Sequence, residues 1–369
     1  MGLPEHMPAA PEITDRNRLD AWLDALPRNS PDEAAEAHRI VMSITFRATM
    51  RMLPVTLPIL LSENARERGL TPEAIFRRLL SAGITSICPT PATKEKVATL
   101  TDANAASTFA FASASVSDKT TALVGAYDSA TTRRAAWRAL DGDCQALADG
   151  NSLRLRPLWP DGNNPLEHAW QEAVGALTKA GPEWAFWIDW YEKCLAGAPQ
   201  DWEGLLADIA LLPSEDWDKG PKHIAELIAQ LQEKHNLKAR VRDLKAEMDR
   251  LIAAGASAAQ RGHNNPPELV EAELRRECVT IRDRLEEAEA ELDQPAPSPA
   301  VLARVGRFLV EAAAWFGAKF NTAADAFAKT IGVAGGAWVI ANSPALMERL
   351  GALGRKLIDF AQRLPGGPF

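Results

Sequence analysis

The residue types that most often carry chemistry are scattered along this chain. Its six histidines form no H-E-x-x-H or H-x-x-x-H pair, the spacings that would set two imidazoles on one helix face for zinc. The one histidine beside an acid, His168 after Glu167, follows it directly on an expected helix, so the two side chains do not face each other. The acid run 286–289 is typical of a solvated helix face. The sequence therefore predicts no metal site.

Cysteine and glycine patterns lead to the same expectation for cofactors. No C-x-x-C pair is present, which argues against a disulfide framework or a structural zinc site and favours small buried apolar residues. The glycine-rich string 332–336 lacks the Lys-Ser/Thr of a phosphate-binding loop, and no G-x-S-x-G nucleophile elbow occurs. We expect no cofactor. The cysteines are Cys88, Cys144, Cys194 and Cys278.

A tryptophan-rich segment is where a site built from distant residues would lie. Its aromatics recur at helical spacing, which favours a core stripe over a base-stacking platform, because the lysines and arginines that would hold a phosphate backbone are missing there. A pocket in which Trp187, Trp190 and Asp189 converge with His223 would favour an enzyme. The two stripes are Leu166, Trp170, Val174 and Leu177, then Trp184, Trp187, Tyr191 and Leu195.

Composition limits the class of protein. The chain has 369 residues, 46% hydrophobic and 24% charged, which is ordinary for globular proteins. Its net charge of −8 argues against a nucleic-acid partner, which needs a basic surface. The first residues lack the basic and apolar regions of a signal peptide, so the cytoplasm is the expected location, with peripheral contact at the inner membrane as an option.

Helix signals dominate, and no alternation with hairpin turns predicts a strand. Ser30-Pro31 and Thr71-Pro72 read as helix starts. Gly83 reads as a helix stop, and the Leu-Pro pairs at 53–54 and 57–58 read as interruptions. The alanine- and serine-rich stretch 101–121 is assigned as helix. The sequence predicts an all-α protein in four parts: a helical body (1–150), a tryptophan-rich unit (151–220), a coiled-coil hairpin (221–293) and a helical tail (299–369).

Heptad spacing marks the third part. Both arms repeat apolar residues at intervals of 4 and 3, which predicts a coiled-coil seam. An intramolecular antiparallel hairpin is expected, and dimerisation through the same seams is the alternative. Ile224, Ile228 and Leu231 do not follow the heptad register that begins at Leu237. We therefore expect a helix break near His235-Asn236. The seam residues are Leu237, Val241, Leu244, Met248 and Leu251, then Leu274, Cys278, Ile281, Leu285, Ala288 and Leu292.

The link between the two arms contains the string Gly-His-Asn-Asn-Pro-Pro-Glu at 262–268. It resembles a signature of uncharacterised alphaproteobacterial proteins, as does the tryptophan-rich segment ending at His223, and the resemblance implies no activity. Asn265, Pro266 and Glu268 form a capping-box arrangement, echoed at 163–167. A structural role is expected; the alternative is a recognition loop at His263 and Asn264.

The tail combines basic charge with apolar stripes. From residue 299 on, eight Lys or Arg stand against four acids. Two apolar helical stripes flank the stretch 330–347, which contains no charged residue, and basic amphipathic helices of this kind suit an anionic membrane surface. A helical bundle whose basic face docks on the acidic body or on a partner is the other interpretation. The predicted contact residues are Arg304, Arg307, Phe316, Gly332, Gly336, Trp338, Arg355 and Lys356.

Three functions remain open from sequence. The first is a non-enzymatic effector or scaffold, defence- or toxin-like, whose tail contacts or disrupts membrane after release by a signal. The second is a soluble helical adaptor that self-associates or binds a protein partner through its coiled coil and tail. The third is an enzyme with an unrecognised site.

Overall fold

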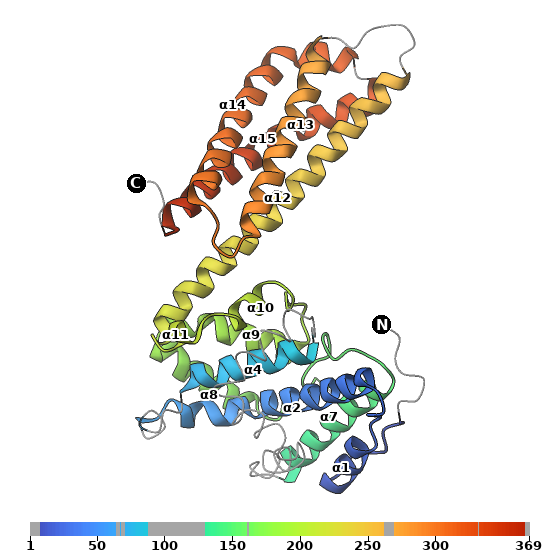
Figure 1. The fold of residues 1–369 in the computed structure, drawn as a ribbon, viewed down its shortest axis with the longest axis vertical. Helices are drawn as coiled ribbons and strands as arrows, with labels where there is room; N and C mark the ends of the chain where they lie inside the picture. The colour runs from blue at the N-terminus through green and yellow to red at the C-terminus, as the bar shows by residue number, and fades with distance from the viewer. Residues whose placement is uncertain are drawn as a thin grey trace. The chain divides into compact units, whose positions relative to one another are not determined.

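The computed structural model describes residues 8–63, 67, 71–87, 130–160, 162–261, 269–330 and 332–365, and their side chains except at 254–261, 269–275, 319–330 and 332–343. Within these ranges every regular element is a helix, which confirms the all-α class. The chain divides into two compact units, Met1–Leu231 and Gln232–Phe369 (Figure 1).

The first unit is built on two apolar cores. The larger one joins helices from the predicted body to the tryptophan-rich helices, with Phe76 stacked on Trp187 at 4.9 Å between ring centres. The smaller one surrounds Trp22 and Cys144. The elements are α1 (Arg16–Asp24), α2 (Pro31–Leu60), α4 (Pro72–Ile87), α7 (Ala130–Ala148), α8 (Glu167–Ala180), η1 (Pro182–Trp184), α9 (Ala185–Ala196), α10 (Leu205–Ala210), α11 (Ser214–Trp217) and the start of α12 (Pro221–Arg261).

Helix α2 begins as the sequence predicts and runs further than expected. The Ser30 hydroxyl accepts a hydrogen bond from the Glu33 backbone N–H at 3.2 Å, which confirms the cap. The predicted interruptions at Pro54 and Pro58 are wrong, because the helix continues through both to Leu60. Each proline removes one backbone hydrogen bond, but both lie in the last two turns, where buried Leu57 and its neighbours hold the helix in the core.

Gly83 does not end a helix, which is a second correction. Helix α4 passes through it and extends to Ile87. A Cβ at Gly83 would lie 2.8 Å from the Trp202 ring and 3.1 Å from the Phe46 ring. This glycine is therefore explained by close aromatic packing rather than by a helix stop.

The second capping-box arrangement, at 163–167 before α8, forms only in part. The Asn164 side chain accepts from the Leu166 backbone N–H at 3.0 Å and donates to Glu167 at 3.1 Å. The helix begins at Glu167, later than the predicted start at Pro165, and its N-cap residue makes no side-chain capping bond. Asn164 thus forms a turn before the helix rather than capping it.

The second unit is a bundle of four helices in which successive helices run in opposite directions (Figure 1). They are α12, α13 (Leu269–Leu292), α14 (Pro299–Thr330) and α15 (Gly332–Arg363). The predicted helix start at Ser298-Pro299 is confirmed. Both heptad arms and both tail stripes bury their apolar residues in one core, with Leu244, Leu285, Leu309 and Leu353 each at most 1% exposed.

The break predicted near His235-Asn236 is wrong, since α12 is continuous across it. The change of phase that suggested a break has another cause. Ile224 and Ile228 belong to the core of the first unit, whereas Leu237 and Val241 belong to the core of the second. A single helix can serve two cores on different faces without bending.

Helices α14 and α15 are in backbone contact. A Cβ at Gly306 would lie 2.6 Å from the Gly354 carbonyl oxygen, and a Cβ at Gly354 would lie 2.6 Å from that of Gly306. Further along, a Cβ at Gly351 would meet the Ala313 Cβ at 3.5 Å. Only residues without side chains permit helices to approach this closely.

This contact gives a stability prediction. We expect Gly306→Ala to lower the free energy of unfolding by about 1–3 kcal/mol, because the new methyl group meets rigid backbone. Gly317→Ala is the matched control on α14, since its Cβ would meet only the Met347 sulfur at 3.5 Å. Urea unfolding followed by circular dichroism measures both. Equal stability of the two variants would contradict the close contact.

Candidate functional site

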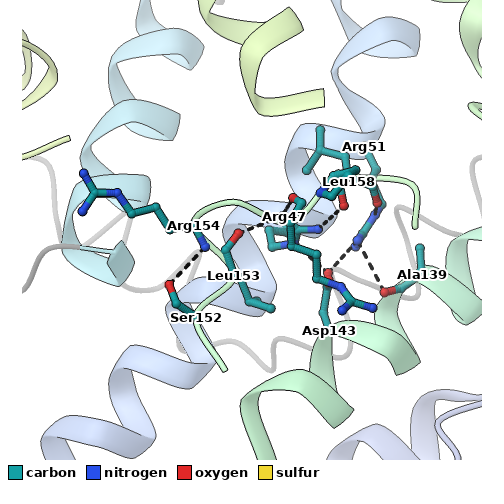
Figure 2. A network of polar contacts seen from close by, with 10 residues as sticks. Arg47, Arg51, Ala139, Asp143, Ser152, Leu153, Arg154 and Leu158 are labelled. Atoms are coloured by element: carbon teal, nitrogen blue, oxygen red, sulfur yellow. Dashed lines mark hydrogen bonds and ion pairs between the residues drawn. The ribbon is translucent and has the colours of Figure 1, made fainter. Parts of the chain in front are cut away.

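The strongest polar constellation of the first unit is a buried network of two arginines and one aspartate (Figure 2). Arg47 and Arg51 lie one turn apart on α2, and both bind the same carboxylate oxygen of Asp143 on α7, at 2.9 and 2.6 Å. The Asp143 side chain is fully buried. Arg156 lies 3.5 Å from its other oxygen.

The arginines also hold an irregular segment in place. Arg47 donates to the carbonyls of Arg156 and Pro157 at 2.8 and 2.6 Å, and Arg51 donates to that of Leu158 at 2.8 Å. These carbonyls lie in no helix, so their donors come from elsewhere. The network therefore fastens segment 153–158 to α2 and α7, which is a structural role.

Charge keeps Asp143 ionised in spite of its burial. Burial alone would raise the pKa of this carboxyl, but Arg47 and Arg51 outweigh it and hold the pKa below its ordinary value. A permanently ionised acid that accepts from two guanidinium groups is a poor proton carrier. It is a good anchor for neighbouring helices.

A small pocket adjoins this network. Arg47, Arg154, Arg156, Phe46 and Trp202 are among its lining residues, and its volume is 20 Å³ for a water-sized sphere. That is room for about one water molecule, not for an organic substrate.

The described cysteines are unsuited to nucleophilic chemistry. Burial raises the pKa of Cys194 and of Cys278 to about 12, and the pKa of Cys144 well above its ordinary value. Reactive cysteines need the opposite shift. The prediction that these three are buried apolar residues is confirmed.

The residues named for a possible enzyme are engaged separately. Trp187 and Trp190 are buried against Phe76. Asp189 pairs with Lys193 at 2.7 Å, whereas His223 pairs with Asp216 at 3.0 Å. The tryptophan stripe is thus a core stripe, and Asp189 and His223 are paired with different neighbours.

Two further features of the described residues concern metal binding and membrane insertion. No group of three or more His, Cys, Asp or Glu side chains there is placed to hold a metal ion. Helix α2 is long and apolar enough to cross a membrane, but 67% of its apolar window is buried and it carries Arg47 and Arg51. Its burial and its two arginines fit a core helix.

The predicted seam and tail residues fall into two classes. Leu237, Val241, Leu244, Met248, Ile281, Leu285 and Phe316 are buried in the shared core. Arg304, Arg307, Arg355 and Lys356 are exposed on α14 and α15. The tail therefore has the predicted amphipathic character, with its apolar stripes turned inward to the bundle.

Ion pairs join the tail to the heptad arms. Arg349 on α15 pairs with Glu247 on α12, and Arg363 pairs with Glu233, both at 2.5 Å. Arg304 on α14 pairs with Glu287 on α13. The acids that bind the basic tail thus include three from the heptad arms, within the second unit.

Some predicted residues cannot be assessed, while others were missed. His263, Asn264 and the stretch 101–121 lie outside the described residues, as do the side chains of Leu274, Gly332, Gly336 and Trp338. Sequence reasoning missed the Arg47–Arg51–Asp143 network, although two arginines one turn apart in an apolar helix were a usable signal. It also missed Gly306, Gly351 and Gly354, whose spacing on α14 and α15 was visible.

Comparisons with known proteins add no relative. No protein-family model matches the chain, and no curated protein or solved structure matches it. The resemblance of segment 262–268 to alphaproteobacterial proteins therefore stays a prediction.

Removing the buried carboxylate should be costly. We expect Asp143→Asn to lower the free energy of unfolding by about 3–5 kcal/mol, because Arg47 and Arg51 lose their buried counter-charge. Urea unfolding measures it, with Asp189→Asn as an exposed control that should change stability by less than about 1 kcal/mol. A similar small loss for both variants would refute the anchoring role.

The same carboxyl predicts a pH dependence. Its folded pKa lies below the unfolded one, so its stabilising contribution is full above the unfolded pKa and is lost as pH falls through the folded pKa. The stability gap between wild type and Asp143→Asn should therefore narrow below about pH 4. Urea titrations of both proteins from pH 7 to acid measure this. A gap that widens on acidification would show the opposite sign of shift.

Proposed function

We propose that this protein is a non-enzymatic effector or scaffold whose C-terminal hairpin, α14–α15, contacts an anionic membrane surface once its apolar stripes are uncovered. The observation that carries the proposal is the division of each helix into a buried leucine-rich stripe and exposed basic residues, Arg307, Arg355 and Lys356 among them. Helices of this type lie in a membrane interface with the stripe in the acyl boundary and the cations at the headgroups.

The free energy gained by burying the apolar stripes determines how such a membrane contact forms. Each fully buried leucine, valine or phenylalanine of the stripes contributes about 1.5–3 kcal/mol, so the closed bundle is the stable form in water. Ion pairs with exposed partners, such as Arg304–Glu287 and Arg363–Glu233, contribute only about 0.2–1 kcal/mol each. Release therefore requires another apolar environment for the stripes, which a bilayer supplies, and it does not occur by loss of charge pairs alone.

Sequence composition between the stripes adds support. Residues 330–347 contain no Asp, Glu, Lys or Arg and begin at the last residue of α14. A hairpin with an uncharged tip and basic flanks can approach lipid with little electrostatic cost.

The second candidate is a soluble adaptor that binds a protein or a second copy of itself. Burial of both stripes in a four-helix core favours it, because the closed unit leaves no long apolar stripe on α14 or α15 open among the described residues. In this proposal the heptad seams act as a coiled coil that re-pairs with a partner's helices, and the defined oligomer it forms does not bind lipid.

Vesicle flotation of the full chain separates these functions. We expect binding to phosphatidylglycerol-containing vesicles and weaker binding by the variant R307Q/R355Q/K356Q. Each cation near an anionic surface contributes about 1 kcal/mol, so the affinity should fall about 100-fold. Leakage of an entrapped dye would mark a membrane-disrupting effector.

The matched control is K179Q/K222Q/R240Q, which removes the same charge from exposed positions outside the tail. It should bind vesicles like the wild type. Failure of wild type to float at low salt, together with a discrete oligomer in solution, would reject the membrane proposal and leave the adaptor.

A further inference from the structure

Helices α14 and α15 each carry two neighbouring apolar faces, not one. The first is the leucine stripe in the four-helix core, with Leu309 and Leu353 at its centre. The second is offset by one residue and joins α14 to α15 through Gly306, Val310 and Gly354. The two faces therefore bind different partners: the glycine face binds the other tail helix, and the leucine stripe belongs to the core shared with the heptad arms.

The contacts on these two faces differ in kind. On the glycine face the backbones meet at Gly306 and Gly354, with Val310 and Ile358 packed beside them, so the two helices exclude lipid and water from each other. Beside the apolar core that α12 and α13 share, long charged side chains join the two helices, such as Arg242 and Lys245 on Glu289 at 2.6 and 2.5 Å. Contacts of the first kind persist in a bilayer, whereas contacts of the second kind belong in water.

We infer that α14–α15 leaves the bundle as an intact hairpin and that α12–α13 is the cover that conceals its leucine stripes in the closed state. The opening would separate the ion pairs Arg349–Glu247 and Arg363–Glu233 while the Gly306–Gly354 contact stays closed. The biological use of this opening rests on the proposed membrane function. The opening itself is a property of the fold and can be measured without lipid.

The chain contains a native reporter of the opening. Cys278 on α13 is 3% exposed in the shared core, so a maleimide reaches it only when the core is open. Cys144 and Cys194, buried in the first unit, report unfolding elsewhere in the chain. A Cys88→Ser background removes the fourth thiol.

Two cross-links distinguish opening along the hairpin boundary from other routes. E247C/R349C, joined by a short bismaleimide, ties α12 to α15 and should block hairpin release. A313C/G351C ties α14 to α15, and its Cβ separation of 3.5 Å suits a disulfide. The second cross-link locks the hairpin as a unit and should leave its release free.

Labelling of Cys278 is followed by mass spectrometry in sub-denaturing urea, first without lipid. We expect E247C/R349C to slow labelling about tenfold or more relative to the uncrosslinked protein, and A313C/G351C to leave the rate unchanged within about twofold. Cys144 and Cys194 should stay unlabelled in all three. Slowing by A313C/G351C as strong as that by E247C/R349C would overturn the inference, and so would labelling that neither cross-link affects.

The same proteins are then mixed with phosphatidylglycerol-containing vesicles. Faster Cys278 labelling in wild type and A313C/G351C, but not in E247C/R349C, would support the hairpin as the lipid-binding form. If the urea results are as expected but vesicles do not change Cys278 labelling, the membrane function is rejected and the opening of the bundle is established. Vesicle-induced labelling in the E247C/R349C protein would count against the inference.

Discussion

Close approach of two backbones at Gly306 and Gly354 is the constraint on which the second unit depends. It fixes α14 and α15 as a pair and so fixes which of their faces remains for the heptad arms. The leucine stripes then turn toward α12 and α13, and the cations remain outside. These two glycines therefore explain both which faces of the tail helices are exposed and how the four-helix core is packed.

The first unit depends instead on a buried network of ion pairs. Asp143 gathers Arg47 and Arg51 from α2, and these arginines hold the carbonyls of segment 153–158. Removing one member of such a buried cluster leaves an uncompensated charge, so its members stabilise the unit only together. The tryptophan-rich helices around Trp187 and Trp190 surround Phe76 of α4 as a core, which explains an aromatic concentration that would otherwise suggest a binding platform.

The functional hypothesis follows from the contrast between the two hairpins of the bundle. Beside their shared apolar core, α12 and α13 are joined by ion pairs between charged side chains, whereas α14 and α15 meet through their backbones at Gly306 and Gly354. In this hypothesis, α12–α13 is a water-compatible cover and α14–α15 is a lipid-compatible hairpin. Burial of the leucine stripes keeps the two hairpins together until another apolar environment competes for these stripes.

By itself, the sequence determined the helical class, the starts of α2 and α14, and which apolar residues of the last helices are buried, because these depend on local spacing and capping chemistry. Tertiary structure decided the rest. Pro54, Pro58 and Gly83 lie inside helices because packing outweighs local propensity, and α12 continues through its phase change because two cores bind its two faces. Which residues face Asp143, and which glycines meet, depends on segments far apart in the chain, and local pattern does not encode that.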